Sequence, residues 1–376
     1  MPHEASEFQI PLQRLLVGLI VILVPITIFG LYMGLNANLQ VQQINGTYFR
    51  TISQSSATIA SSYVVERVSE LVQIANEPGV QRAVLSADGA YTSMSEEAIR
   101  ARSEKEEARW NTSESDALAK TILGSDLALD IRRHRELNPK LLNVVIIDQS
   151  GATIAATEKP AHYLQTATEY WRAISAKEER AVHVSDVRYD DKSREQYVTI
   201  TVPVYQEGSG RFIGAITALV DVNPLFTFFN QMQFGRTGRV FLVRTDGTVV
   251  AAAGINPAER MRSEEFNAIR DALGNLQGRE AGYVHATLGN RKQYLIGFAD
   301  TGLRMSYPAL SWIVVASQEV HEAEGPIRAM GTFAVVMTAL AVILLSVLAA
   351  YVFLHRKQRL EDLADKEAEK VNVMSA

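Results

Sequence analysis

The chain of 376 residues contains no cysteine, so disulfide bonds and cysteine nucleophiles are both excluded. Its formal net charge is -5, which provides no basic excess of the kind that indicates a nucleic-acid partner. It also lacks an HExxH motif, a GxSxG motif and a glycine-rich phosphate-binding loop, and its histidines do not have the spacing of metal ligands. We therefore expect no catalytic site, no metal, no cofactor and no nucleic-acid partner.

Two long segments lack charge altogether. Residues 15–35 read LLVGLIVILVPITIFGLYMGL, and residues 331–354 read GTFAVVMTALAVILLSVLAAYVFL. Each is long enough to cross a hydrocarbon core of about 30 Å as a helix. The sequence therefore predicts two transmembrane helices. A cleaved signal peptide is the alternative for the first, but its apolar run exceeds the roughly 7–15 residues usual for such a peptide.

Basic residues suggest how these two spans are oriented. Arg356, Lys357 and Arg359 follow the second span directly, whereas Arg328 stands alone before it. Since basic residues gather on the cytoplasmic side, residues 1–14 and 355–376 are expected in the cytoplasm and residues 36–326 outside. A large external region without cysteine fits the bacterial periplasm. We predict a two-pass protein of the bacterial inner membrane with a large periplasmic domain.

One pattern occurs twice within the external region. VIIDQSGATIAAT begins at Val145 and FLVRTDGTVVAAA begins at Phe241, so the copies are offset by 241 minus 145, or 96, positions, and Gly151 aligns with Gly247. Ser-Gly and Asp-Gly between apolar runs are typical of a β-hairpin, because a tight turn needs positive φ. We predict two tandem α+β modules with antiparallel sheets: a membrane-distal first module over about 80–225 and a membrane-proximal second module over about 235–320.

A long helix is expected between the first membrane span and these modules. Apolar residues recur at helical spacing from Asn36 to Asn76, and Pro78-Gly79 ends the pattern. The residues expected on one face are Val41, Ile44, Tyr48, Ile52, Ile59, Tyr63, Val68, Leu71 and Ala75. This face packs either on its own domain or on a second copy of the chain. Further along, we expect a loop with a short helix over 86–111, a helix over about 114–137, and strands within 181–222.

The order of these motifs resembles a double-Cache (dCache) domain, the periplasmic sensor of bacterial chemoreceptors, histidine kinases and diguanylate cyclases. The resemblance covers about 36–326 and includes the long helix, both hairpins, EYWRAISAKEERAVHVSDVRYDD and LSWIVVASQEVHEAEGPIR. It implies two PAS-like antiparallel-sheet modules on a long N-terminal helix. It also implies that a small molecule binds in the first module while the second transmits the signal.

The resemblance also implies a set of ligand-binding residues. In the amino-acid-binding members of the family two aromatic residues and two acids are among the residues that hold the ligand, and here Trp171, Tyr189, Asp191 and Asp221 match them. Two carboxylates beside an aromatic ring suit an ammonium group, through ion pairing and cation–π attraction. The alternatives are a core position for Trp171 and a turn or cap role for Asp221.

Two departures from the family pattern affect the expected ligand. Glu169 stands where the family has the arginine that anchors a carboxylate, and Arg172 replaces the tyrosine after the tryptophan. A free α-amino acid is therefore not implied. Either Arg172 takes over the anion, or the site holds another amine or small polar molecule.

The expected cytoplasmic end is short. Residues 355–376, HRKQRLEDLADKEAEKVNVMSA, have helical periodicity but are too few for a kinase, cyclase or methyl-accepting domain. We thus expect either a truncated receptor or a homodimeric receptor subunit that signals to a separate cytoplasmic protein. The predicted function is a transmembrane sensor of a small molecule, with an amine-containing metabolite as the favoured class. The alternatives are a structural membrane subunit that keeps the fold without a ligand, and an extracellular enzyme.

Overall fold

The computed structural model describes residues 12–91, 93–112, 116–175, 181–190, 195–255, 261–274, 281–325, 332–333 and 335–351. Residues 46–319 form one compact unit, and residues 1–45 together with 320–376 form another. Asp191 and the expected cytoplasmic segment 355–376 lie outside the described residues. Over the described part of the chain, no helix combines the length and the apolar character needed to cross a membrane.

Helices and strands follow one another in two similar series. The first series comprises α1 (Leu12–Ala75), α2 (Pro78–Gly89), α3 (Glu96–Trp110), α4 (Asp116–Leu123), α5 (Asp126–Leu137), β1 (Leu141–Asp148), β2 (Thr153–Ala156), α6 (Glu169–Ser175), β3 (His183–Val184), β4 (Arg188–Asp190), β5 (Glu195–Tyr205) and β6 (Phe212–Asp221). The second comprises α7 (Asn223–Gln231), β7 (Gln233–Phe234), β8 (Gly238–Arg244), β9 (Val249–Ala251), α8 (Glu264–Gly274), β10 (Ala281–Thr287), β11 (Gln293–Asp300), a 3-10 turn (Leu303–Met305) and β12 (Trp312–Glu319).

Both predicted hairpins are present. β1 pairs with β2 and β8 with β9, both antiparallel. The turn glycines Gly151 and Gly247 have φ of 87° and 85°, the left-handed region that a side chain disfavours. The first sheet has the order β2-β1-β6-β5-β3, with β4 also on β5, and the second has β9-β8-β12-β11-β10, with β7 also on β8. Matching β1 with β8 makes the two orders correspond, so the prediction of duplicated antiparallel modules is confirmed.

The strands of the first sheet are buried on both faces. Successive residues of β1, from Val144 to Ile147, are all buried, although their side chains alternate between the two faces. On one face α2 lies close to the sheet, since a Cβ added at Gly214 of β6 would lie 3.0 Å from Val84. On the other face, side chains of α3, α4 and α6 form one apolar cluster with the sheet: Trp110, Ala119, Ile122, Val145, Ile147, Ala156, Trp171, Ile174 and Ala215. Helices on both sides explain why these strands read as nearly continuous apolar runs.

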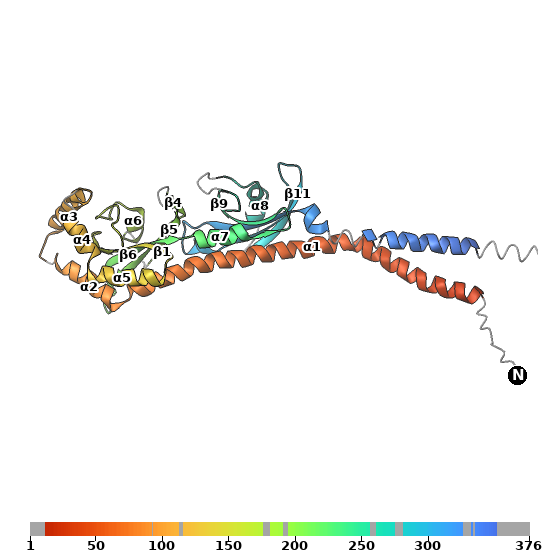
Figure 1. Cartoon of the computed structure of the whole chain (residues 1–376), viewed down its shortest axis with the longest axis horizontal. Helices are drawn as coiled ribbons and strands as arrows, with labels where there is room; N and C mark the ends of the chain where they lie inside the picture. The colour runs from red at the N-terminus through yellow and green to blue at the C-terminus, as the bar shows by residue number, and fades with distance from the viewer. Residues whose placement is uncertain are drawn as a thin grey trace, which may run out of the picture. The chain divides into compact units, whose positions relative to one another are not determined.

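Helix α1 lies alongside both sheets, with α6 and α8 on the opposite side of them (Figure 1). The Phe49 ring packs edge-on against Phe234, with centroids 5.3 Å apart. The Tyr63 hydroxyl donates to the backbone oxygen of Asp221 over 2.7 Å. One helix therefore contacts both modules of the 46–319 unit.

The apolar face predicted for this helix was partly wrong. Tyr48 and Ile59 are 57% and 44% exposed, whereas Phe49 and Ala60 are buried. Small residues occupy much of the buried face because the helix backbone approaches the strands closely. A Cβ at Gly297 of β11, for instance, would lie only 2.4 Å from the Phe49 backbone oxygen. The sequence pattern favoured large side chains and so selected a neighbouring face.

Three further expectations are corrected. Residues 96–110, predicted mainly as loop, form α3, whose N-terminus is capped by the Ser95 side chain accepting from Ala98 N. The helix predicted over 114–137 is two helices, because the hydroxyl of Ser125 accepts from Ala128 N and starts α5 there. The strand run at 181–189 is limited to β3 and β4. Helix α3 is highly charged and has few buried positions, so its sequence shows little of the apolar periodicity by which a helix is predicted.

Candidate functional site

A row of buried hydroxyls crosses the first sheet beneath α6. Thr201 of β5 pairs in register with Thr217 of β6, which pairs in turn with Val145 of β1. Side chains paired in register share a face, and Val145 belongs to the cluster that includes Trp171, so these threonines face α6. The Thr201 and Thr217 hydroxyls are 3.0 Å apart, and Thr199 is buried next along β5. We call Thr199, Thr201 and Thr217 the threonine row. Its hydroxyls are the polar groups of an otherwise apolar sheet face, and buried hydroxyls require hydrogen-bond partners.

Trp171 packs in the core above this row. Its side chain is buried, its ring centroid lies 6.0 Å from that of Phe212, and a Cβ at Gly151 would be 3.4 Å from the indole. These contacts give Trp171 a packing role between the hairpin and the sheet. Its contact with a ligand stays a prediction.

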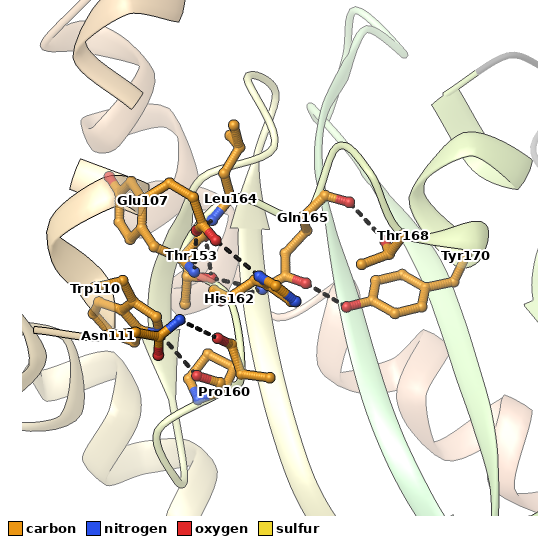
Figure 2. A network of polar contacts seen from close by, with 12 residues as sticks. Glu107, Trp110, Asn111, Thr153, Pro160, His162, Leu164, Gln165, Thr168 and Tyr170 are labelled. Carbon is orange, nitrogen blue, oxygen red and sulfur yellow. Dashed lines mark hydrogen bonds and ion pairs between the residues drawn. The ribbon is translucent and has the colours of Figure 1, made fainter. Parts of the chain in front are cut away.

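The segment that leads into α6 is held by the polar network in Figure 2. Glu107 of α3 accepts from the backbone N–H groups of Tyr163 and Leu164, over 2.7 and 2.8 Å, and lies 2.8 Å from the His162 ring nitrogen. Burial acts to raise the pKa of Glu107, but these hydrogen bonds outweigh it and leave the pKa below its usual range. Glu107 was not among the residues selected from the sequence, because a charged residue in a segment expected mainly as loop carries no signal of such a contact.

The same network reaches α6 itself. The Gln165 side-chain amide donates to the His162 backbone oxygen over 2.6 Å, and the Tyr170 hydroxyl donates to Gln165 Oε1 over 2.5 Å. On the other side of the segment, Trp110 Nε1 donates to the Pro160 backbone oxygen over 2.8 Å. The start of α6, and with it Trp171, is therefore positioned by hydrogen bonds from α3 and from the preceding segment (Figure 2).

The two residues that depart from the family pattern lie at the surface. Glu169 forms an ion pair of 2.7 Å with Arg188, which joins α6 to β4. The Arg172 guanidinium and Nε donate to the backbone oxygens of Ala167 and Thr168 over 3.2 and 3.4 Å. Arg172 is thus turned toward the start of its own helix. Its proposed role in binding an anion stays a prediction.

Tyr189 and Asp221 lie at the same end of the sheet. Arg188 of β4, Tyr197 of β5 and Asp221 of β6 are aligned across three strands, and Tyr189 follows Arg188. Tyr189 is 38% exposed. One Asp221 carboxylate oxygen accepts from the Asn223 N–H over 2.8 Å, so the turn role left open by the sequence is present. Tyr189 pairs with Gln196, whose side chain points to the opposite face of the sheet from those of Tyr197 and Asp221. The structure therefore places Asp221 on the face that α6 and Trp171 cover, and Tyr189 on the other face.

Asp221 also acts on the electrostatics of α1. Burial raises the pKa of Tyr63 to about 12, and the Asp221 charge adds to the rise. The Tyr63 phenol therefore stays protonated and able to donate to the Asp221 backbone. This bond connects α1 to the strand end at which the predicted ligand residue lies.

A pair of buried acids, Asp88 and Asp148, was not anticipated. Asp148 is the last residue of β1 before the hairpin turn, and its Oδ1 accepts from Ser150 N, Ser150 Oγ and Ala152 N over 2.9, 2.6 and 3.0 Å. Its Oδ2, and both carboxylate oxygens of Asp88, make no well-aligned hydrogen bond within the described residues. Burial raises the pKa of Asp88 to about 6; the Asp148 charge adds to the rise, and the Gln149 backbone N–H offsets part of it.

Comparison with known proteins establishes the family. The family model described as Cache domain, in its dCache form, matches residues 37–327, which include both modules and most of α1. The chain therefore belongs to the Cache-domain family, as its sequence motifs indicated. No match was found among curated proteins.

Several solved sensor domains are similar to this chain. The ligand-binding domain of the Pseudomonas aeruginosa amino acid chemoreceptor PctC, in complex with GABA, is 16% identical, with 73% of this chain and 99% of that chain covered and a TM-score of 0.46. The ligand-binding domain of the Pseudomonas fluorescens chemoreceptor CtaA, in complex with L-isoleucine, is 11% identical, with coverage of 76% and 97% and a TM-score of 0.46.

Proposed function

We propose that the chain is a sensory receptor or receptor subunit that binds a small molecule on the first module and regulates a separate cytoplasmic protein. The observation that carries this proposal is the threonine row on a sheet face covered by α6, with Asp221 at its end. Sensing is the role that the Cache family implies. No catalytic role is proposed for these residues.

The proposed ligand carries an amine. Asp221 and Asp191 are the proposed carboxylates for an ammonium group, and Trp171, on the same face of the sheet as Asp221, is the proposed aromatic component. Tyr189 faces the other side of the sheet and is left out of the proposed site. Arg172 is the cation available for an acidic group on the ligand. The departure at Glu169, which pairs with Arg188, supports an amine without an obligatory α-carboxylate.

The proposed location is a two-pass protein in the bacterial inner membrane. The support comes from the uncharged runs at 15–35 and 331–354 and from the basic residues after the second run. The sensor would then lie in the periplasm and both ends of the chain in the cytoplasm.

We also propose a homodimer paired along α1. Within the 46–319 unit, Tyr48, Ile59 and Val65 are exposed on this helix, and Ser55 and Ser62 between them are small and exposed. Small residues among exposed apolar ones allow a second helix to approach closely. A shift of one α1 against the other would give the sensor a route to its partner, since packed helices commonly move by about 1–2 Å in such switches.

The ligand site is tested with an amine screen on the purified chain, followed by Asp221→Asn. A ligand at 100 times its Kd stabilises the folded state by about 2.7 kcal/mol, which a thermal-shift screen detects. Asparagine keeps an oxygen for the Asn223 N–H but removes the charge, so we expect a loss of about 2 kcal/mol in affinity, or about 30-fold. Asp130→Asn, on the exposed surface of α5, is the matched control.

Two outcomes would contradict the proposal. Unchanged binding by Asp221→Asn would place the ligand elsewhere. A complete absence of stabilising amines would favour the alternative function, a structural membrane subunit that keeps the Cache fold.

A further inference from the structure

The second module contains a helix that corresponds to α6. Helix α8 joins β9 to β10, as α6 joins β2 to β3. Trp171 and Phe266 are each the third residue of their helix, and each packs on the turn glycine of its own hairpin: a Cβ at Gly247 would lie 2.7 Å from Phe266. The backbone bond from Ser263 N to Gly247 O, at 2.9 Å, matches that from Gln165 N to Gly151 O, at 2.7 Å. Helix α8 thus occupies the position in its module that α6 occupies over the proposed ligand site.

A cavity of about 260 Å³ lies at the N-terminal end of α8. Phe241, Ala252 and Leu288 supply part of its apolar wall, and Arg239, Arg262 and Tyr294 supply polar groups. A volume below the usual 300–1,000 Å³ of drug-sized sites limits its occupant to a small molecule. The combination of an apolar wall with a few polar groups is typical of a ligand site rather than of a packing defect.

Glu265 fixes one of these polar groups. It is 2% exposed; Oε1 is 2.5 Å from Arg239 Nη2 and accepts from the Ser317 hydroxyl over 3.2 Å, and Oε2 accepts from the Ser263 hydroxyl over 2.9 Å. Burial acts to raise the pKa of Glu265, but Arg239 and Ser263 outweigh it and the pKa lies below its usual range. Glu265 is therefore an ionised, fully engaged partner that holds Arg239 in place.

The remaining polar groups favour an anion. Arg239 uses one of its five N–H groups on Glu265, and Arg262 adds a second guanidinium to the wall. Glu264 also lies in the wall, and its Oε2 accepts from the Gly289 N–H over 3.1 Å. The formal charges of the two arginines and two glutamates cancel, so the cavity has no net charge to attract a ligand. Recognition rests instead on hydrogen bonding, because the two guanidinium groups have more N–H donors than the two carboxylates can accept. Guanidinium groups match a carboxylate in geometry and charge.

We infer that the second module binds a small aliphatic carboxylate in this cavity, with the carboxylate on Arg239 and Arg262 and the alkyl chain against Phe241, Ala252 and Leu288. Its occupant and its module differ from those of the amine site on the first module, so it does not depend on that site. Such a receptor would bind two chemically different ligands, an amine on the first module and a carboxylate on the second.

The test uses calorimetric titration of the purified full-length chain with sodium 4-methylpentanoate and, separately, with 3-methylbutylamine. The acid is expected to bind and the amine is not. Arg262→Ala changes an exposed side chain and is expected to weaken acid binding at least tenfold. Ala252→Leu fills the apolar part and is expected to abolish binding. Arg270→Ala, on α8 but outside the cavity wall, is the matched control.

The remaining outcomes are equally decisive. Binding of the amine as tightly as the acid, failure of both to bind, or full acid binding by Arg262→Ala with an unchanged melting temperature would each overturn the inference. Asp221→Asn should leave acid binding intact, so failure of the amine site and failure of this site are distinguishable.

Discussion

The buried acids Asp88 and Asp148 make the folded state sensitive to pH. Asp88 is 8% exposed, and its pKa rises from 3.8 to about 6 on folding, with burial as the main cause and the Asp148 charge as the second. Because the folded pKa lies above the unfolded one, the unfolded chain loses this proton first as the pH rises. Stability is therefore lost between about pH 4 and pH 6, and the whole penalty is present above about pH 6.

The size of this penalty follows from the shift. A difference of about 2 pKa units corresponds to about 3 kcal/mol at neutral pH. Solvent screening at the edge of the module reduces the expected value to about 1–2 kcal/mol. Asp88→Asn removes the buried charge and its repulsion with Asp148 while keeping the size of the side chain. We expect this variant to be about 1–2 kcal/mol more stable than the natural chain at pH 7.5, and to keep only about a third of that advantage at pH 4.5.

The assay is urea unfolding followed by tryptophan fluorescence, since Trp110 and Trp171 both report on this module. Asp130→Asn, an exposed acid on α5, is the control and should show the same difference from the natural chain at each pH. The reasoning is refuted if Asp88→Asn is less stable than the natural chain at pH 7.5. It is equally refuted if its effect is the same at pH 4.5 and pH 7.5.

Two further predictions concern the contacts between modules and between chains. Asp186, between β3 and β4, forms an ion pair of 2.5 Å with Arg244 of the second module and lies 3.5 Å from Trp312 Nε1. Asp186→Ala should therefore lower the free energy of unfolding by about 1 kcal/mol in a urea titration. A change smaller than the experimental error would mean that this ion pair does not stabilise the fold. Ser55→Cys, at an exposed position of α1, should form a disulfide-linked dimer when membranes are treated with an oxidant and run on non-reducing electrophoresis. Ser53→Cys is the control, because Ser53 is buried and its cysteine should not crosslink. Equal crosslinking of the two variants would contradict pairing along α1.

The sequence identified those parts of the fold that depend on a few adjacent residues. Each hairpin follows from a Gly-containing turn between β-branched runs, because a positive φ at Gly151 or Gly247 is a local requirement. The order of such local signals was sufficient to identify the Cache family. By contrast, the extent of α3 was underestimated as a short helix within a loop, since Ser103 and Trp110 are its only buried residues and leave little periodicity.

What only the tertiary structure decided depends on residues far apart in the chain. Tyr48 and Phe49 are adjacent apolar residues of α1, and the close approach of β11 determined that Phe49 is the buried one. The ligand residues proposed from the family motif were placed in the same way: Trp171 packs into a core built by three helices, whereas Asp221 remains at a strand end. The conformation of a turn is determined by a few adjacent residues and can be predicted from the sequence. The burial of a residue and the environment of a charge depend on which distant elements pack together, and so they require the tertiary structure.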